Sequence, residues 1–413
     1  MGKPQGRDAE RRDSMRQRPA SALPGVTDLA MALHFTAEEF HERQRRVAAV
    51  LVARGLDALL MFQQESMYYL TGYDSFGFCF FQCLVFGAGG RLALLARSAD
   101  LRQAERTSLV HDIRIWPDAA DADPARQLRE LLESLGLRGS RIGIETATSG
   151  LTYANGLALA RALDGFCTLE AADHLVDRLR AVKSDAELAY VRRAGELADD
   201  ALEAALGEIA PEVDEGRIPA EMQAAVLAGG GDYPANEFVI GSDADALLCR
   251  YKSGRARLAA EDQLTLELAG VYRHYHAALM RTVLIGRPMP QLERMHAACR
   301  EALAACESVL RPGCSAGDVF AAHAQVIDRF GMATARLNAC GCSLGARFAP
   351  SWMDAPMCYR DNPEPLLPGM VMFLHMVLTD TPSASAMTLG RTYILTDGAP
   401  QPLSRVPLDL LLC

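Results

Sequence analysis

The sequence predicts two domains, an α/β domain followed by a larger α+β domain. The chain has 413 residues, more than one hydrophobic core usually organises. Its first half alternates short apolar runs with helical stretches, which is typical of an α/β layer. Later, long helices alternate with pairs of strands. We therefore expect an α/β domain over residues 34–176 and an α+β domain over residues 177–405.

The two ends of the chain are expected to lie outside these domains. Residues 1–33 are polar, charged and contain Pro and Gly, so we expect a disordered extension there. Met15 and Met31 offer alternative start sites within it. Residues 406–413 are expected to form a C-terminal tail.

The first domain has a clear helix start and five runs of strand length. Thr36 is expected to cap a helix that ends near Gly55. The strands are predicted at "DALLMF", "QCLVFG", "RLALLAR", "DIRIWP" and "RIGIE", and together they predict a mixed sheet.

The second domain contains the stretch with the most chemistry. Ser184 and Glu187 have the spacing of a capping box before a long helix. The stretch "LTLELAGVYRHYHAALMRT" predicts two strands and a turn, with Glu267 on the first strand. His274 and His276 are two residues apart, so we expect them on one face of the second strand. "PGMVMFLHMVL" and "RTYILTDGAPQPLS" predict the closing strands.

Composition excludes several classes of partner. The net charge of −10 argues against nucleic acid or an anionic membrane surface as the main partner. No apolar run reaches the ~18 residues of a membrane helix, and no secretory signal is visible. The 11 cysteines are scattered without a zinc pattern, which indicates free thiols in a reducing compartment. We expect a cytoplasmic protein.

Several motifs resemble one enzyme family. "RLRAVKSDAELAYVRRA" resembles the start of the catalytic domain in the creatinase, prolidase and methionine aminopeptidase family. "YYLTGYDSFGF" resembles the N-terminal domain of its creatinase and prolidase branch. The resemblance covers about residues 35–405. It implies a creatinase-like N-terminal domain, a pita-bread C-terminal domain and a homodimer.

The metallopeptidases of this family bind two metal ions through two Asp, one His and two Glu. By the resemblance, these five positions fall here on Glu267, Ala278 or Leu279, Cys342, His375 and Gly390. The family's peptidase-type His falls near Arg250. At most one carboxylate ligand is kept, so we predict that the protein binds no metal ion.

Metal-free members of this family cleave C–N bonds in small amidine-like solutes. The His and two Glu of creatinase would fall near Arg250, Met280 and His375, and none matches. The stretch containing Glu267, together with "SWMDAPM" and "FLHMVL", looks more like the ectoine hydrolase branch. The resemblance thus implies hydrolysis of a zwitterionic amidine, with ectoine opened to N-acetyl-2,4-diaminobutyrate.

Four residues are candidates for catalysis. Glu267 lies among apolar neighbours, and burial raises a carboxyl pKa, so it is a candidate base or nucleophile. A salt bridge to Arg250 or Arg281 is the alternative. His276, His375 and then His274 are candidates for proton transfer, and core packing is the alternative for each.

Six residues are candidates for substrate binding. Arg250 and Arg347 could grip a carboxylate, whereas Tyr251 and Trp352 could wall a pocket or stack on a cationic ring. Tyr73 and Gln82 lie in the segment that reaches towards a partner subunit's site in the family. For each of these residues singly, an ion pair or ordinary packing is the alternative.

Three other functions stay open at this stage. They are a creatinase-like amidinohydrolase acting on another guanidino or amidino acid, a peptidase like Xaa-Pro aminopeptidase, and a solute-binding protein without activity. A shared cleft for Glu267, His276 and His375 would favour an enzyme, and scattered side chains would favour the binding protein.

Overall fold

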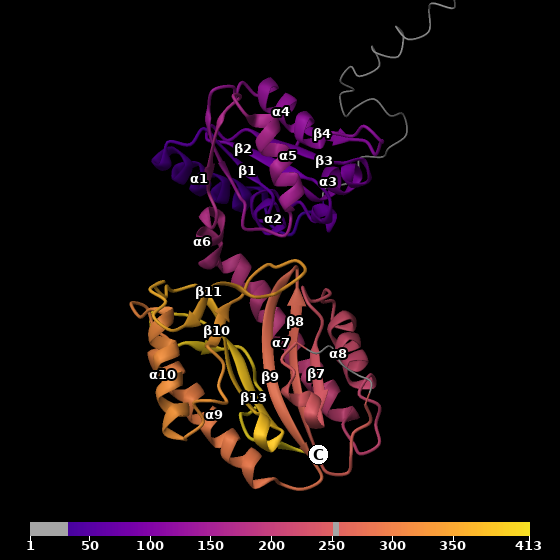
Figure 1. The fold of residues 1–413 in the computed structure, drawn as a ribbon, viewed down its shortest axis with the longest axis vertical. Coiled ribbons are helices and arrows are strands. Elements are labelled where there is room, and N and C mark those ends of the chain that lie inside the picture. Colours follow the sequence, from indigo (N-terminus) through magenta and orange to yellow (C-terminus); the bar gives the residue numbers. More distant parts are fainter. Residues whose placement is uncertain (1–31, 251–255) are drawn as a thin grey trace, which may run out of the picture.

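The computed structural model describes residues 32–250 and 256–413. Almost all of the expected extension over residues 1–33, and also Tyr251, therefore lie outside the described residues. Figure 1 shows two domains stacked along the long axis, joined through helix α6 (Leu175–Ala181) and the start of helix α7 (Asp185–Glu208).

The N-terminal domain is a six-stranded mixed sheet with helices on both faces. Its strand order is β4-β3-β2-β1-β5-β6. The strands are β1 (Ala58–Met61), β2 (Cys83–Gly87), β3 (Leu92–Arg97), β4 (Ile113–Trp116), β5 (Arg141–Ile144) and β6 (Thr168–Ala171). The helices are α1 (Ala37–Arg54), α2 (Gln64–Thr71), α3 (Leu101–Thr107), α4 (Pro124–Ser134) and α5 (Tyr153–Leu163). The five predicted strands are confirmed, whereas α2 and β6 were not predicted.

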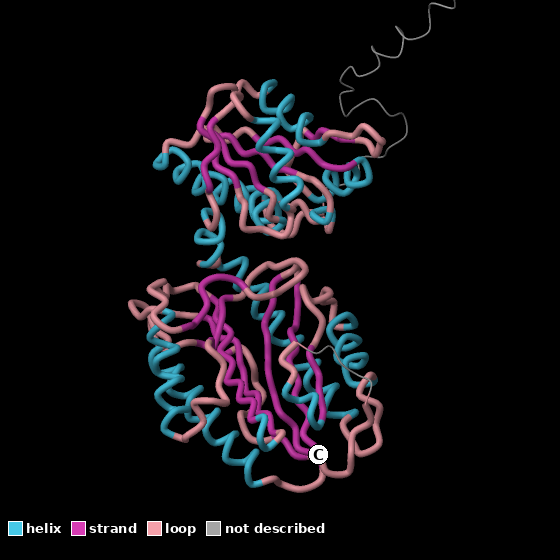
Figure 2. Tube along the Cα trace, viewed as in Figure 1, coloured by secondary structure: helices cyan, strands magenta, loops and turns pink. Residues whose placement is uncertain are grey.

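The C-terminal domain is built on a curved, largely antiparallel sheet. The main strand order is β11-β10-β12-β13-β9-β8-β7, and β14 and β15 join it at β13 and β9. The strands are β7 (Val239–Ser242), β8 (Asp262–Tyr272), β9 (Tyr275–Ile285), β10 (Ala339–Ser343), β11 (Asp354–Tyr359), β12 (Val371–Asp380), β13 (Ser385–Ile394), β14 (Gln401–Pro402) and β15 (Leu411–Leu412). Its further helices are α8 (Arg217–Ala228), α9 (Pro290–Val309) and α10 (Ala316–Arg329). Figure 2 shows these helices flanking the long strands.

Both predicted helix starts are confirmed in detail. The Thr36 hydroxyl accepts the backbone N–H of Glu39 at 3.3 Å, which caps α1. Ser184 and Glu187 exchange two hydrogen bonds, of 2.9 and 3.3 Å, at the start of α7. Such caps satisfy N–H groups that have no partner inside the helix.

A seam between β9 and β13 divides the large sheet into two halves. The backbones of these strands pair at three positions, Arg281, Met280 and Leu279 of β9 with Leu389, Gly390 and Arg391 of β13. Beyond these three positions, hydrogen bonds from threonine side chains take the place of backbone–backbone hydrogen bonds. The Thr392 hydroxyl accepts the N–H of Ala278 at 2.9 Å and donates to its carbonyl at 2.8 Å. On the other side, the Thr282 hydroxyl accepts the N–H of Thr388 at 2.7 Å.

The end of the chain differs from the expected tail. Strand β15 pairs with β9 in parallel, with Leu411 opposite Val283. The Cys413 N–H donates to the Leu284 carbonyl at 2.9 Å. The physical reason is the seam, because β13 pairs with β9 only as far as Arg281 and leaves the next residues of β9 open to another strand.

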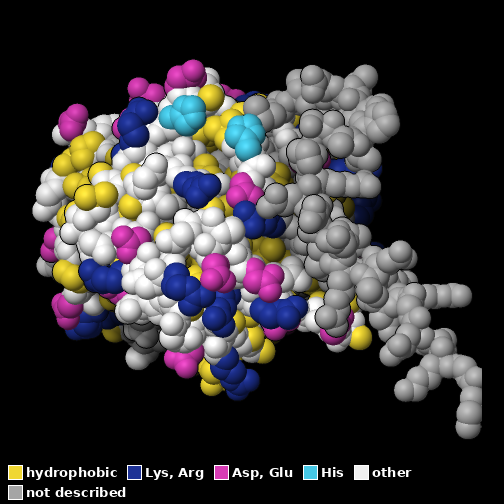
Figure 3. Space-filling view, turned by 90° about the horizontal axis from the view of Figure 1, so that it is seen from above, with side chains coloured by type: hydrophobic (Ala, Val, Ile, Leu, Met, Phe, Trp, Pro, Cys, Tyr) yellow, Lys and Arg dark blue, Asp and Glu magenta, His cyan; other side chains and the backbone are white. Residues whose placement is uncertain are grey.

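The outer surface is mixed in charge. Figure 3 shows the molecule from the side of the N-terminal domain, where acidic and basic side chains are interspersed with apolar ones. In the part of the chain that the structure describes, no helix combines the length and the apolarity that spanning a membrane requires.

Candidate active site

A single row of residues crosses four strands of the C-terminal sheet. Glu267 of β8 lies opposite Met280 of β9, Met280 lies opposite Gly390 of β13, and Gly390 lies opposite His375 of β12. Residues directly opposite each other in an antiparallel sheet project from the same face. We call Glu267, Met280, Gly390 and His375 the cross-sheet row.

The two ends of the cross-sheet row are accessible. Along β8, Glu267 is the partly exposed residue of an otherwise buried strand interior. Along β12, His375 is likewise the partly exposed residue within a buried run. Two polar side chains on one face are thus largely buried but keep some exposure, whereas their strand neighbours are covered.

The spacing of the row suits a small molecule. Neighbouring strands lie about 4.8 Å apart, so three steps separate the backbones of Glu267 and His375 by roughly 14 Å. Both side chains project from the same face of the sheet, so they flank Met280 and Gly390 across a distance of that order.

Burial moves the pKa values of the two ends in opposite directions. Burial raises the pKa of Glu267 to about 7, and the charge of Arg250 works against that rise. Burial lowers the pKa of His375 to about 4, and Arg250 lowers it further. Arg250 is itself exposed and acts on both groups, so the structure brings together three predicted site residues. Among the described residues, His375 Nδ1 has no hydrogen-bond partner.

The residues of the row do not fit a two-metal centre. The row offers one carboxylate and one imidazole, because Met280 supplies only a thioether and Gly390 has no side chain. A Cβ at Gly390 would lie 2.9 Å from the Phe373 ring, which therefore fills the space of a ligand there. Across residues 32–250 and 256–413, no group of three or more His, Cys, Asp or Glu is arranged to hold a metal ion. We derive no step through a metal.

His276 lies on the same face but is held by the backbone. Its Nε2 accepts the N–H of Ala235 at 3.0 Å, and its Nδ1 lies 3.4 Å from the Gly345 carbonyl. Burial lowers its pKa to about 3, so the ring is neutral with both nitrogens engaged. This geometry favours a role in joining two loops over the predicted proton transfer.

His274 corrects an expectation, because it does not share a strand face with His276. Arg273 and His274 form the turn between β8 and β9, with φ of 52° and 64°. A two-residue hairpin turn of this kind requires positive φ at both positions. The His274 ring stacks on Phe348 at 4.3 Å and its Nε2 lies 3.0 Å from Asp74 of the N-terminal domain. It therefore belongs to the domain interface.

Arg347 and Trp352 are also engaged elsewhere. Arg347 lies 3.4 Å from Glu65 of the N-terminal domain and 3.7 Å from Asp354 of its own domain, so it forms ion pairs on both sides of the domain boundary. Trp352 is 1% exposed and packs near His276, with ring centroids 6.3 Å apart. In this arrangement neither side chain is free for the predicted substrate contact.

Tyr73 and Gln82 are buried inside the N-terminal domain, which argues against their predicted role in substrate binding. They are 0% and 1% exposed, and the Tyr73 hydroxyl donates to Gln82 Oε1 at 3.2 Å. Gln82 in turn donates to Gln64 Oε1 at 2.7 Å. A closed network of this kind satisfies the polar groups without any ligand.

Two residues of the site were not predicted, Met280 as a member of the row and Phe373 beside it. One signal was available in the sequence. Counting outwards from the turn at Arg273 and His274 pairs Glu267 with Met280, because the sum of paired residue numbers is constant along a hairpin. The partners on β13 and β12 could not be counted in this way, since they come from distant segments.

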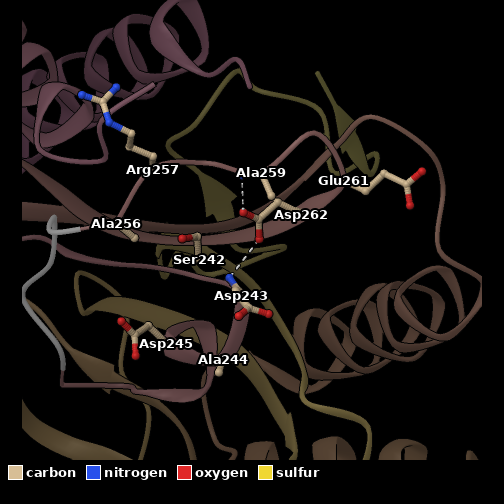
Figure 4. A pocket seen from close by; sticks show the side chains of 9 residues that line it. All are labelled: Ser242, Asp243, Ala244, Asp245, Ala256, Arg257, Ala259, Glu261 and Asp262. Carbon is tan, nitrogen blue, oxygen red and sulfur yellow. Dashed lines mark hydrogen bonds between the residues drawn. The ribbon is translucent and has the colours of Figure 1, made fainter. Parts of the chain in front are cut away.

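A surface hollow of about 510 Å³ lies away from the row (Figure 4). It is lined by Ser242, Asp243, Ala244, Asp245, Ala256, Arg257, Ala259, Glu261 and Asp262. The Asp262 carboxylate accepts the N–H groups of Asp243 and Ala259, both at 2.9 Å. Glu261 points away from the hollow (Figure 4), and Asp262 is engaged in holding the local backbone.

Comparisons with known proteins agree with this architecture. Residues 43–182 match the creatinase/prolidase N-terminal domain, and residues 189–397 match metallopeptidase family M24. The chain therefore belongs to metallopeptidase family M24, a family of hydrolases. The predicted fold, a creatinase-like N-terminal domain followed by a pita-bread domain, is confirmed.

The chain is similar to several individual proteins over most of its length. Ectoine hydrolase of Halomonas elongata is 28% identical over 359 residues, covering 83% of this chain and 90% of that protein. An uncharacterised hydrolase/peptidase of Sinorhizobium fredii is 26% identical over 393 residues, covering 92% and 98%. The solved Xaa-Pro dipeptidase of Bacillus anthracis shares the fold with a TM-score of 0.78 at 20% identity, covering 91% and 100%.

Proposed function

We propose that this protein hydrolyses a C–N bond in a small zwitterionic amidine without a metal ion, with ectoine opened to N-acetyl-2,4-diaminobutyrate. The observation that carries the proposal is the cross-sheet row. In this row a titratable carboxylate and a neutral imidazole flank Met280 and Gly390, at positions where a metal centre would need further carboxylates. The similarity to ectoine hydrolase supports the choice of substrate.

The charges of the site suit a zwitterion. Arg250 acts electrostatically on both Glu267 and His375, and a guanidinium can bind a substrate carboxylate through both oxygens. An amidinium carries positive charge over N–C–N, so its place is beside Glu267. That positive charge favours the ionised form of Glu267 once substrate is bound.

The reaction needs Glu267 as a carboxylate. In one course, Glu267 takes a proton from water while the water oxygen bonds to the amidine carbon. The bond from that carbon to one ring nitrogen then breaks, and the proton on Glu267 passes to this nitrogen, which leaves an amide and a free amine. In the other, a Glu267 oxygen bonds to the amidine carbon, and the bond from that carbon to one ring nitrogen breaks as this nitrogen takes a proton from water. The hydroxide that remains then bonds to the same carbon and the bond to Glu267 breaks, which restores the carboxylate and leaves the same amide and amine.

The structure changes the role that we assign to histidine. The sequence predicted that His276 or His375 protonates the leaving nitrogen. With pKa values of about 3 and 4, both rings are neutral at pH 7 and are poor proton donors. We therefore propose that the neutral, partly exposed ring of His375 accepts a hydrogen bond from substrate or water and orients it, while Glu267 moves the proton.

One substrate panel tests the proposal. Purified protein is incubated with ectoine, 5-hydroxyectoine, creatine and a Xaa-Pro dipeptide, and products are followed by mass spectrometry. We expect N-acetyl-2,4-diaminobutyrate from ectoine. Cleavage of the dipeptide alone would support a peptidase, and cleavage of creatine alone an amidinohydrolase. Calorimetric binding of ectoine without turnover would support a solute-binding protein, and each of these results would overturn the proposal.

A further inference from the structure

The floor between the two ends of the cross-sheet row is apolar. Met280 is 7% exposed and lies directly between Glu267 and Gly390. Next to it, the Phe373 ring covers Gly390 and is itself 1% exposed. The Met280 thioether, with the Phe373 ring beside it, thus forms the apolar surface that a molecule bound between Glu267 and His375 would meet.

The backbone of this floor offers no strong free acceptor. Arg281 projects from the opposite face of β9, and its Nη1 donates to the carbonyl oxygens of Met280 and Gly390, both at 2.8 Å. Further along the seam, the Thr392 hydroxyl is engaged by both backbone groups of Ala278. The Met280 and Gly390 carbonyls and the Thr392 hydroxyl are therefore already paired.

We propose that Met280 selects the class of substrate, namely amidines whose central carbon carries a small alkyl group rather than an amino group. This inference rests on the proposed function. An amidine carbon is planar and has three substituents. When its two nitrogens face Glu267 and His375, the third substituent faces Met280. A methyl group there packs against the thioether, whereas an N–H would be buried without an acceptor.

The expected difference in kcat/KM between the methyl compound and the amino compound has a lower bound. One methyl group in an apolar pocket changes kcat/KM by roughly 10- to 200-fold. A buried donor without a partner adds a penalty of similar size. The methyl compound should therefore exceed the amino compound in kcat/KM by at least ~10-fold.

Three compounds with the same ring and carboxylate test the inference on the wild-type protein. They are ectoine, its analogue with hydrogen on the amidine carbon, and its analogue with an amino group there. We expect kcat/KM to fall in that order. Equal or higher kcat/KM for the amino compound would overturn the inference while leaving the proposed function intact. Failure to hydrolyse any of the three would overturn both.

Variants then assign the effect to Met280. Met280→Leu keeps an apolar group of similar size and should keep the substrate order. Met280→Gln supplies an amide oxygen of similar reach and should reduce the methyl-over-amino preference at least ~5-fold, since the amino group gains an acceptor. Met289→Gln makes the same change at the start of α9, outside the row, and should leave the preference unaltered.

An unchanged preference in folded Met280→Gln, checked by circular dichroism, would contradict the inference. If that variant does not fold, loss of the order in Met280→Leu would do so.

Discussion

Glu267 and His375 show how one physical cause can prepare two groups for different tasks. Burial penalises the charged form of each, which raises the pKa of the acid and lowers the pKa of the base. At neutral pH the row therefore holds a carboxyl group near its midpoint and an uncharged imidazole. Titratable pairs with pKa values displaced in this way are typical of acid–base sites.

Replacing Glu267 with Gln separates catalysis from stability. The amide keeps the shape but cannot take a proton, so kcat on ectoine should fall at least ~10²-fold. Because burial raises the pKa of Glu267, the ionised carboxylate destabilises the folded state, and wild-type stability is lost as pH rises from about 4.5 through about 7. The variant should therefore melt higher than wild type at pH 8, and by less at pH 5.

A purely structural role for Glu267 predicts the opposite results for the Gln variant. If Glu267 served in a structural ion pair, the Gln variant would melt lower at pH 8 and would keep near-normal kcat. Measuring kcat and melting temperature on one preparation distinguishes these results, and near-normal turnover would remove Glu267 from the mechanism.

The pH dependence of activity should follow the same group. Only the carboxylate form of Glu267 can act as base or nucleophile, so kcat/KM should rise with pH and reach half its plateau near pH 7. Initial rates on ectoine between pH 5.5 and 9 would show this limb. A profile that is flat, or that falls across this range, would contradict the assignment.

At the scale of elements, the seam between β9 and β13 decides the geometry of the row. The row crosses the seam at Met280 and Gly390, the middle one of the three positions where the strands pair through their backbones. Arg281 is buried, and its Nη1 bridges the carbonyls of these two residues. Its Nε and Nη2 have no partner among the described residues, so this buried guanidinium is held mainly by the floor of the site.

Thr392→Val tests the strength of the seam. Valine keeps the shape of threonine but leaves the N–H and carbonyl of Ala278 without their partner. Buried unpaired groups of this kind cost ~1–3 kcal/mol, so the free energy of unfolding in urea should fall by about that amount. Thr168→Val on the exposed side of β6 is the matched control and should cost little. Equal effects in the two variants would show that the seam does not depend on this hydroxyl.

At the scale of the whole molecule, the two domains are tied together around the β8–β9 turn. The Tyr68 hydroxyl donates to the Arg273 carbonyl at 3.1 Å, and Asp74 lies 3.0 Å from His274. Phe348 donates its N–H to Glu65 at 3.1 Å. The N-terminal domain thus fixes the end of the hairpin that carries Glu267 and Met280.

Buried neutral histidines should make the protein sensitive to acid. Burial lowers the pKa values of four of them, to about 4 for His34, 3 for His276, 4 for His323 and 4 for His375. Their stabilisation is present above about pH 6.5 and is lost as pH falls towards these values. Glu145 and Glu267, with pKa values raised to about 8 and 7, act in the opposite sense over the same range. The effect of the four histidines outweighs that of the two glutamates, so the free energy of unfolding should fall as the pH decreases from 6.5 to 4.5.

Urea unfolding at pH 6.5, 5.5 and 4.5 measures this slope directly. His323 contacts Met376 in the helix-covered core, so His323→Met should make the slope shallower. His41 is exposed, and His41→Gln should leave the slope unchanged. Stability that is constant or rises towards pH 4.5 would contradict the account.

Independence from metal is a further prediction for the whole molecule. The row provides one carboxylate and one imidazole where a two-metal centre requires more, so chelator treatment should leave turnover of ectoine unchanged. Elemental analysis should find less than about one tightly bound transition-metal ion per chain. Stoichiometric metal, with activity lost to chelator and restored by manganese or cobalt, would overturn the proposal.

The homodimer and the cytoplasmic location that the sequence leads us to expect stay predictions. Light scattering on purified protein and fractionation of cells would test them separately.

The sequence by itself determined the elements and much of the chemistry. Short apolar runs of strand length located the strands, and capping residues located the starts of α1 and α7. Comparing the metal-ligand positions of the family with this sequence singled out Glu267, the one acid that is kept, and His375, which replaces an acid. Such a change of side-chain type can be recognised without knowing which strands are neighbours.

Only the tertiary structure decided which of the candidates meet. Pairing across β9, β13 and β12 brought Met280 and Gly390 between Glu267 and His375, whereas hydrogen bonds from distant loops held His276. Tyr73 and Gln82 turned inwards to each other, a pairing that their positions in the sequence do not reveal. The physical reason is that local periodicity fixes the face on which a side chain lies. The opposing residue depends on which distant strand supplies the partner, and on its register, and these are set by packing of the whole chain.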